Sequence, residues 1–214
     1  DASTFKEMSE QKDILVIDTR SKESYTQEGT VPGSWYIGID GNFAPWVGAI
    51  VLDINQKIIF ITDDELRVNE IVTRFSRVGY DHTLGYLNGG IDGWKTQDFD
   101  VDYIGSVSAA QFTDMLAKGS MEKPIDVRRE SEYLSEHVLG VESFPLDFIH
   151  ANFAEIDPDK EYFLHCKTGY RSLIATSILK ANGVKKVTDV RGGYEAIKVC
   201  KAPLSEFVCP TTIL

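Results

Sequence analysis

The two halves of this chain repeat one series of motifs in the same order, and this repeat constrains the fold more than any other feature. Five pairs of segments match: residues 17–25 with 125–133, 31–34 with 138–141, 58–61 with 162–165, 77–80 with 181–184, and 88–91 with 191–194. An acidic stretch near residues 98–106 separates the halves. The 214 residues therefore accommodate two domains of about 100 residues each. We expect one domain over residues 1–100 and another over 106–214.

Each half alternates short apolar runs with helical patterns, which favours an α/β fold. In the second half, strands are predicted over 124–127, 144–146, 162–165 and 187–190, and helices over 109–118, 130–135, 148–155, 170–181 and 194–199. Ser108 is the expected N-cap of the first of these helices. The alternation predicts two domains of one kind, each a mostly parallel sheet with helices on both faces. In such sheets the functional side chains lie beyond the carboxyl ends of the strands.

The most informative loop begins at Cys166, directly after an apolar run and before a helical pattern. Loop N–H groups and the positive end of a helix dipole converge at such a position, and together they bind an anion. The same setting favours the thiolate form of a cysteine. Arg171 adds a cation with fixed geometry, and we predict that Cys166 and Arg171 are catalytic. The predicted substrate contacts are Lys167, Thr168, Gly169, Tyr170 and Arg128.

Several neighbours of this loop are better interpreted as structural. Asp126 is expected to hold backbone N–H groups or to pair with an arginine, and Arg128 could simply brace the end of its strand. His137 fits a hydrogen bond within a turn, and His165 fits a place in the core. The pair Gly192–Gly193 fits a turn from strand to helix, because the full spacing of a nucleotide-binding loop is absent.

Four segments of the second half, residues 126–128, 136–138, 166–171 and 192–193, resemble tandem rhodanese-type sulfurtransferases, and the resemblance covers both halves. The ending, residues 203–209, is similar to rhodanese repeats found behind a metallo-β-lactamase-fold domain that handles glutathione persulfide or related sulfane sulfur. The resemblance implies that Cys166 takes sulfane sulfur from thiosulfate or a persulfide and passes it to a thiol or to cyanide. It implies no cofactor for this chain. Because the chain opens on Asp1, we expect a fused N-terminal domain of that kind before it.

Other functions remain open. Cysteine phosphatases of similar shape carry five residues between cysteine and arginine, whereas four separate Cys166 from Arg171, so sulfur is favoured over phosphate. A non-catalytic module that carries persulfide or docks to a larger persulfide-processing protein is the main alternative. Cys166 could also be a buried structural cysteine. Cys200 and Cys209 are interpreted as structural or incidental, and a resolving role for Cys209 stays open.

The first half lacks the same apparatus. Residues 62–67 align with the cysteine loop, so that Thr62 stands where the second half has Cys166, and only Arg67 persists. Three carboxylates fill the intervening positions and would repel an anionic donor. The first domain is therefore predicted to be catalytically inactive.

Composition narrows the remaining function classes. A net charge of −11 argues against nucleic acid or an anionic membrane as a partner. The sequence has no apolar run near the roughly 18 residues of a membrane span and no secretory signal pattern. Three cysteines are too few for a disulfide framework and indicate a reducing compartment, so we expect a cytoplasmic protein. Their spacing predicts no metal site.

Overall fold

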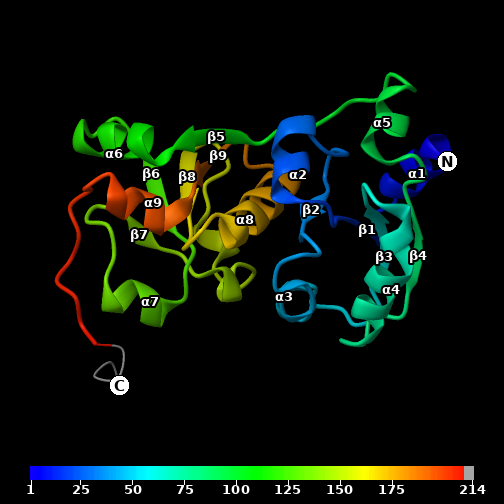
Figure 1. Cartoon of the computed structure of the whole chain (residues 1–214), viewed down its shortest axis with the longest axis horizontal. Helices are drawn as coiled ribbons and strands as arrows, with labels where there is room; N and C mark the ends of the chain where they lie inside the picture. Colours follow the sequence, from blue (N-terminus) through cyan, green and yellow to red (C-terminus); the bar gives the residue numbers. More distant parts are fainter. Residues whose placement is uncertain (210–214) are drawn as a thin grey trace. The chain divides into compact units, whose positions relative to one another are not determined.

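The computed structural model describes residues 1–209 and contains two compact units (Figure 1). The first unit runs from Asp1 to Tyr103, and the second begins at Ile104. All strand pairs within the two sheets of the described chain are parallel. The α/β fold predicted from the alternation of patterns is therefore confirmed for both halves.

The first unit is built on a sheet of four strands in the order β2–β1–β3–β4. Its strands are β1 Ile14–Asp18, β2 Trp35–Tyr36, β3 Lys57–Ile61 and β4 Thr83–Tyr86. Its helices are α1 Ala2–Ser9, α2 Lys22–Glu28, α3 Phe43–Ile50, α4 Val68–Ser76 and α5 Gly90–Lys95, with a 3-10 helix over Glu65–Arg67. Successive residues of the central strand β3 point to opposite faces: Ile59 and Ile61 pack with α1 and α5, whereas Phe60 meets Phe75 of α4.

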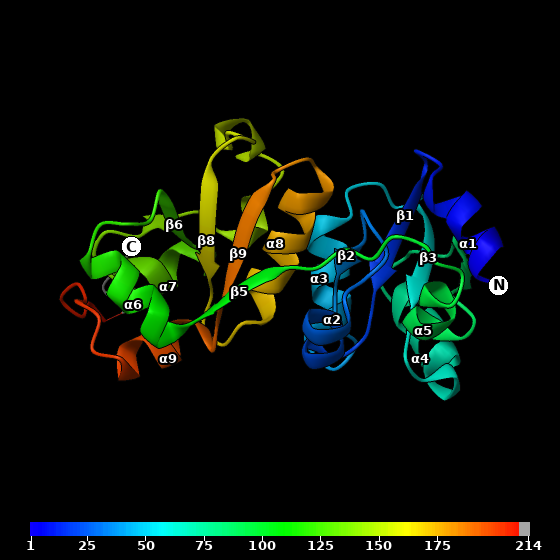
Figure 2. The ribbon, with the colours of Figure 1, turned by 90° about the horizontal axis from the view of Figure 1, so that it is seen from above.

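The second unit has five strands in the order β5–β9–β8–β6–β7. Figure 2 shows β5, β9, β8 and β6 of this sheet from above. Its strands are β5 Gly105–Ser108, β6 Lys123–Asp126, β7 Glu142–Ser143, β8 Glu161–His165 and β9 Lys186–Arg191. Its helices are α6 Ala109–Ala117, α7 Glu130–Ser135, α8 Tyr170–Ala181 and α9 Gly193–Val199, with 3-10 helices over Leu146–Phe148 and Phe153–Glu155. Strand β8 is the middle strand, so the loop that follows it emerges at the centre of the sheet.

The core of the second unit fixes the position of α9 against β8. Phe112 of α6 and Ile197 of α9 are fully buried and pack with Phe163 of β8. Ser108 caps α6 as predicted, and its hydroxyl accepts a hydrogen bond from the backbone N–H of Gln111. No helix among residues 1–209 is both long and apolar enough to cross a membrane.

Three predictions for the second unit were wrong. Strand β5 was missed because Gly105–Ser108 is polar and has no strand-like composition, yet it pairs with β9. The strand expected over 144–146 is instead the two-residue β7 at Glu142–Ser143. The helix expected over 148–155 is replaced by two 3-10 helices. Of the apolar side chains there, only Ile149 is buried and Phe148 is 56% exposed, so tertiary packing does not support a longer helix.

Candidate active site

Cys166 is the first residue after β8, at the carboxyl end of the central strand of the second sheet. Its backbone leads into a short loop that ends at Gly169, whose φ of 101° lies in the left-handed region. The N–H of Gly169 donates a hydrogen bond to Cys166 Sγ over 3.2 Å. The sulfur is therefore held inside the loop, next to the first turn of α8.

The start of α8 supplies the electrostatic setting of this sulfur. The first four N–H groups of an α-helix have no partner within the helix, and the helix dipole places partial positive charge there. Lys167 and Thr168 are exposed at the loop surface, whereas Cys166 is buried. The loop can therefore stabilise a negative charge on a sulfur atom or on a ligand bound to it.

The beginning of α9 holds the loop from the other side. The N–H of Tyr194 donates to the Cys166 carbonyl over 2.7 Å, and the N–H of Glu195 donates to the Lys167 carbonyl over 3.2 Å. A Cβ atom on Gly193 would overlap the Cys166 carbonyl, and Gly193 has a φ of +59°. Gly192–Gly193 form the predicted turn from strand to helix. The structure adds a second role, because only glycine lets α9 approach the cysteine loop this closely.

Arg171 is fixed by a carboxylate that sequence reasoning missed. Its Nη1 and Nη2 lie 2.5 Å and 2.9 Å from the two carboxylate oxygens of Glu132 on α7. Burial alone would raise the pKa of Glu132, but the hydrogen bond and charge of Arg171 outweigh it, and the pKa is lowered. The sequence does not indicate a contact between Glu132 and Arg171, because the two residues lie 39 positions apart in the chain. This two-point contact positions the start of α8 relative to α7.

The lowered pKa of Glu132 predicts a pH-dependent loss of stability in Glu132→Gln. The ion pair stabilises the native state above the ordinary carboxyl pKa of 4.5, and its contribution disappears as pH falls through the lower folded-state value. At pH 7 we expect the variant to lose about 1 kcal/mol of unfolding free energy, since the pair is partly exposed. Urea unfolding of both proteins from pH 3 to 7 measures this difference. A difference that stays constant below pH 4.5 would contradict the assignment.

Arg128 lies two residues after the end of β6. Its side chain mainly holds neighbouring groups in place, and we call this set of contacts the brace. Its Nε donates to both carboxylate oxygens of Asp126 over 3.0 Å and 2.8 Å, and Nη2 donates to the Glu136 carbonyl. The guanidinium also lies 3.9 Å from the ring centroid of Tyr194. Asp126 additionally accepts the backbone N–H of Arg128, so it does both of the things expected of it.

A match to a protein family covers most of the chain. The family model described as the Rhodanese-like domain matches residues 1–97 and, a second time, residues 108–200. This chain belongs to the rhodanese-like family. The two matches agree with the repeat in the sequence and with the two parallel sheets, so the tandem rhodanese arrangement is confirmed.

The chain is similar to several rhodanese-like proteins. The putative sulfur carrier protein YrkF of Bacillus subtilis is 30% identical over 90 residues, which is 42% of this chain and 49% of that protein. The probable adenylyltransferase/sulfurtransferase MoeZ of Mycobacterium tuberculosis is 29% identical over 93 residues, or 42% of this chain and 24% of that protein. A thiosulfate sulfurtransferase from Pseudomonas aeruginosa, known from a crystal structure, is 17% identical with a TM-score of 0.41 and covers 91% of this chain and 41% of its own. This chain thus spans about half or less of the length of each of these three proteins.

In the first rhodanese-like unit, hydrogen bonds within the corresponding loop hold it together. Thr62 follows β3 as Cys166 follows β8, and its hydroxyl is bonded to the backbone of Asp64. The carboxylate of Asp64 accepts the backbone N–H of Leu66 over 2.9 Å. Arg67 pairs with Asp40 and Glu70. In the first unit a side-chain carboxylate therefore occupies a helix-start N–H group.

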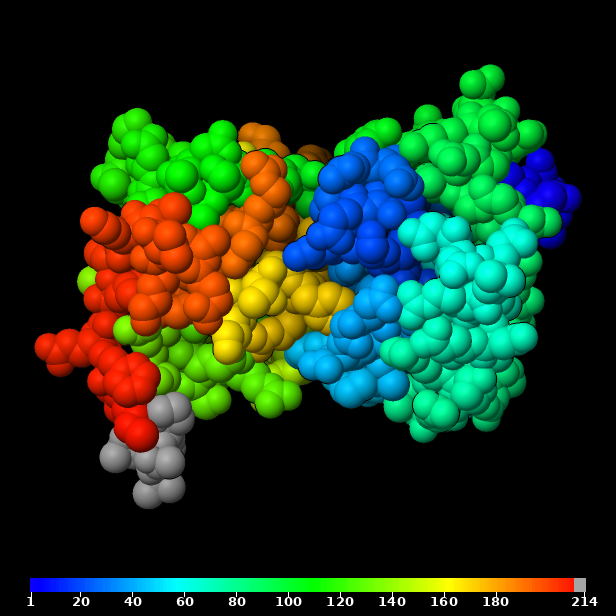
Figure 3. Space-filling model, in the orientation of Figure 1, coloured from blue at the N-terminus to red at the C-terminus, as the bar shows by residue number. Residues whose placement is uncertain are grey.

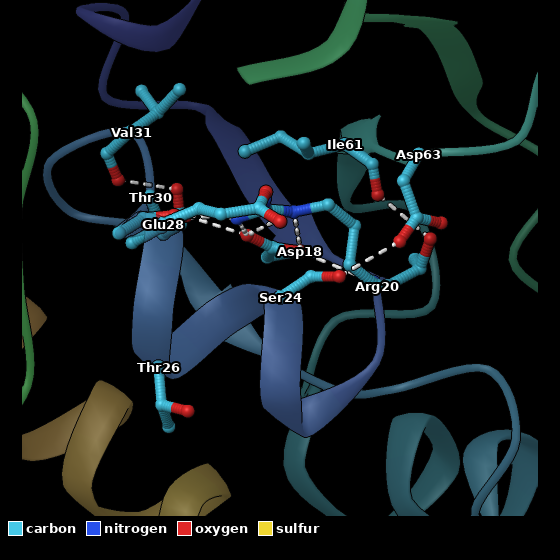
Figure 4. A network of polar contacts seen from close by, with 12 residues as sticks. Asp18, Arg20, Ser24, Thr26, Glu28, Thr30, Val31, Ile61 and Asp63 are labelled. Atoms are coloured by element: carbon cyan, nitrogen blue, oxygen red, sulfur yellow. Dashed lines mark hydrogen bonds and ion pairs between the residues drawn. The ribbon is translucent and has the colours of Figure 1, made fainter. Parts of the chain in front are cut away.

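The brace at the neighbouring strand end is retained in the first unit and is more complete there (Figure 4). Arg20 is fully buried, and both its Nε and Nη2 donate to Asp18. Its Nη1 donates to Glu28 over 2.8 Å, and Nη2 also reaches the Gly29 carbonyl. Asp18 further accepts the hydroxyl of Thr30. The brace exists in both units, whereas the cysteine loop exists in one.

The remaining histidines and cysteines near the site have structural surroundings. His165 is fully buried against the ring of Phe112, and burial lowers its pKa, so it is neutral. His137 Nδ1 lies 2.8 Å from the Tyr133 carbonyl, which is the expected contact within a turn. Cys200 packs against the core and Cys209 is exposed. Among residues 1–209, no group of three or more His, Cys, Asp and Glu side chains is placed to hold a metal ion.

Proposed function

We propose that this protein is a sulfurtransferase that moves sulfane sulfur through a persulfide on Cys166. The observation that carries the proposal is the hydrogen bond from the Gly169 N–H to Cys166 Sγ at the start of α8. A backbone N–H that points at a sulfur atom at the start of a helix is placed to stabilise negative charge there, which a nucleophile that forms a persulfide requires. Membership of the rhodanese-like family supports sulfur transfer as the reaction class.

The reaction has two half-reactions. In the first, the Cys166 thiolate attacks the outer sulfur of thiosulfate; the S–S bond breaks and sulfite leaves with the bonding electron pair. A persulfide donor reacts in the same way and releases a thiolate. In the second, an acceptor thiolate or cyanide attacks the outer sulfur of the Cys166 persulfide, and Cys166 Sγ leaves as a thiolate. This is ping-pong covalent catalysis.

The other residues of the loop bind and position the sulfur. N–H groups between Lys167 and Arg171 stabilise the negative outer sulfur, and the Thr168 hydroxyl provides a further donor. Lys167, exposed at the loop, attracts anionic donors to a protein whose net charge is −11. Arg171 locks the loop through Glu132. The first unit contributes no sulfur chemistry, because Thr62 replaces the nucleophile.

A persulfide-carrying or docking module is the second candidate. The observation that favours it is the burial of Cys166, which is only 1% exposed. A partner that opens the loop, such as a metallo-β-lactamase-fold domain fused before this chain, would then exchange sulfur with Cys166. In either role we assign the protein to the cytoplasm, on the three free cysteines.

The test is the intact mass of the protein after incubation with thiosulfate and, separately, with glutathione persulfide, for the wild type and Cys166→Ala. We expect the wild type to gain one sulfur atom, which cyanide or a thiol then removes. The variant should gain none, because Cys166 is the proposed carrier. Sulfur loading that survives in Cys166→Ala would overturn that assignment and point to Cys200 or Cys209, since residues 1–103 contain no cysteine.

Turnover separates the two candidate functions. Repeated transfer to cyanide or a small thiol supports the enzyme, whereas one equivalent of persulfide without turnover supports the carrier. Hydrolysis of an aryl phosphate would indicate a phosphatase instead. No adduct from either donor, with Cys166 free and reduced, would leave only the docking role.

A further inference from the structure

A cavity of about 450 Å³ lies beside the cysteine loop of the second unit. Helices α7 and α9 supply most of its wall, and Lys167, Arg128 and Phe207 complete it. Phe207 belongs to the C-terminal tail, which is hydrogen-bonded along residues 135–139 through Ser135 and His137. Figure 3 shows this tail, in red, lying beside α9. The volume is within the roughly 300–1,000 Å³ of ordinary small-molecule sites.

The cavity shares its wall with the cysteine loop. Lys167 directly follows Cys166, and Tyr194 holds the Cys166 carbonyl through its N–H. Glu132 holds Arg171. A molecule bound in the cavity therefore lies next to the residues that fix the nucleophile, although Cys166 itself is not part of the lining.

The internal repeat shows what is unusual about Arg128 in this wall. In the first unit, Arg20 has all three guanidinium nitrogens bonded, and Nη1 donates to Glu28, eight residues further on. Arg128 also has a glutamate eight residues further on, Glu136. Among residues 1–209, however, Nη1 of Arg128 has no hydrogen-bond partner, although its side chain is only 5% exposed. A guanidinium N–H donor thus remains available at the wall of the cavity.

Glu136 is drawn away from Arg128 by two side chains of α9. Lys198 Nζ lies 2.5 Å from its carboxylate, and the hydroxyl of Tyr194 donates to the same oxygen. The hydrogen bonds from Lys198 and Tyr194 lower the pKa of Glu136, so it remains ionised and bound to them. In the first unit, by contrast, the carboxylate of Glu28 accepts a hydrogen bond from Nη1 of Arg20.

We propose that Nη1 of Arg128 binds the carboxylate of an organic thiol that discharges the Cys166 persulfide. Each of the three carboxylates that line the cavity has a cationic neighbour: Glu132 has Arg171, Glu136 has Lys198, and Glu195 has Lys167 in an exposed pair at 4.0 Å. A guanidinium N–H forms a stronger hydrogen bond with a carboxylate than with a neutral acceptor. The inference rests on the proposed function and names its acceptor class.

The transfer step follows the second half-reaction. The acceptor carboxylate bonds to Arg128, and its thiolate attacks the outer sulfur of the persulfide. The S–S bond to Cys166 breaks, its electron pair stays on Cys166 Sγ, and the product is the persulfide of the acceptor. Cyanide bypasses this subsite because it carries no carboxylate.

The test compares two acceptors that differ only in charge, 3-mercaptopropionate and 3-mercaptopropionamide, after loading with thiosulfate. The closing variant is Lys198→Leu with Tyr194→Phe, which frees Glu136 to bond Nη1 of Arg128 as Glu28 bonds Arg20. The preference for the carboxylate, the ratio of the two kcat/KM values, should fall about 10-fold. The ratio cancels any change in the loop that affects both acceptors alike.

Adding Glu136→Ala to the closing variant provides the decisive control. With no carboxylate left to close the site, the preference should return to the wild-type value. Lys185→Leu, which breaks an exposed lysine–aspartate pair elsewhere in the second unit, should leave it unchanged. An unchanged preference in the closing variant, or no recovery in the triple variant, overturns the inference. Failure of thiosulfate to load the wild type would instead overturn the proposed function.

Discussion

Replacing Cys166 with serine is expected to lower turnover of thiosulfate to thiocyanate by at least about 10³-fold. A serine hydroxyl is far less acidic than a thiol and does not form a persulfide, so the first half-reaction has no nucleophile and the second has no persulfide to discharge. The hydroxyl can still accept the Gly169 N–H, which keeps the loop intact. Cyanide-dependent formation of thiocyanate measures the change.

The other two cysteines provide matched controls for this substitution. Cys200→Ser and Cys209→Ser should each keep activity within a few-fold of the wild type, because neither side chain lies in the loop. Circular dichroism and a thermal melt check that all three variants fold. Turnover by folded Cys166→Ser within 10-fold of the wild type would remove Cys166 from the mechanism.

Gly193→Ala is expected to lower turnover on the order of 10²-fold without touching the nucleophile. The added Cβ would overlap the Cys166 carbonyl, and φ at this position is +59°, so α9 and the cysteine loop must separate. A displacement of about 1 Å in a reacting group costs about this much in rate. The positive φ adds about 1–3 kcal/mol of strain, measured as a loss of unfolding free energy.

The repeat supplies the control for Gly193→Ala. Gly90 holds the same position in the first unit, with a φ of +58°, and a Cβ atom added there would lie 3.2 Å from the Thr62 carbonyl oxygen. Gly90→Ala should therefore destabilise its own unit while turnover per folded molecule is retained. If both variants lose turnover equally, the loss comes from instability rather than from the geometry of the loop.

Most of the fold followed from the sequence because its signals are local. The helix over 170–181 has the bounds that the pattern predicted, and Ser108 caps α6 as expected. Strand β5 was missed since its residues are polar, and it becomes a strand only through its pairing with β9. The helix expected over 148–155 failed for the converse reason: its apolar spacing is right, but most of the segment is not buried.

The candidate site was predictable only where one loop carries the chemistry. Residues 166–171 are contiguous, so the cysteine, the glycine and the arginine were all identified from one segment. Glu132 and Tyr194 were missed, because each meets the loop only after the chain has folded. The role of Arg128 was also only partly predictable. The sequence left open whether Arg128 supports the end of its strand or attracts an anionic substrate. The comparison with Arg20 shows that Nε and Nη2 of Arg128 make the supporting contacts, whereas its Nη1 stays without a partner in the described part of the chain.

Helix α9 contacts the cysteine loop and also lines the neighbouring cavity. Its first N–H groups hold the carbonyls of Cys166 and Lys167, and one turn further on Lys198 controls the carboxylate beside Arg128. A shift of this one helix would therefore change the position of Cys166 and the shape of the neighbouring cavity at the same time. Ping-pong kinetics treats donor and acceptor steps as separable, but substitutions in the core beneath α9 should change both rate constants in concert.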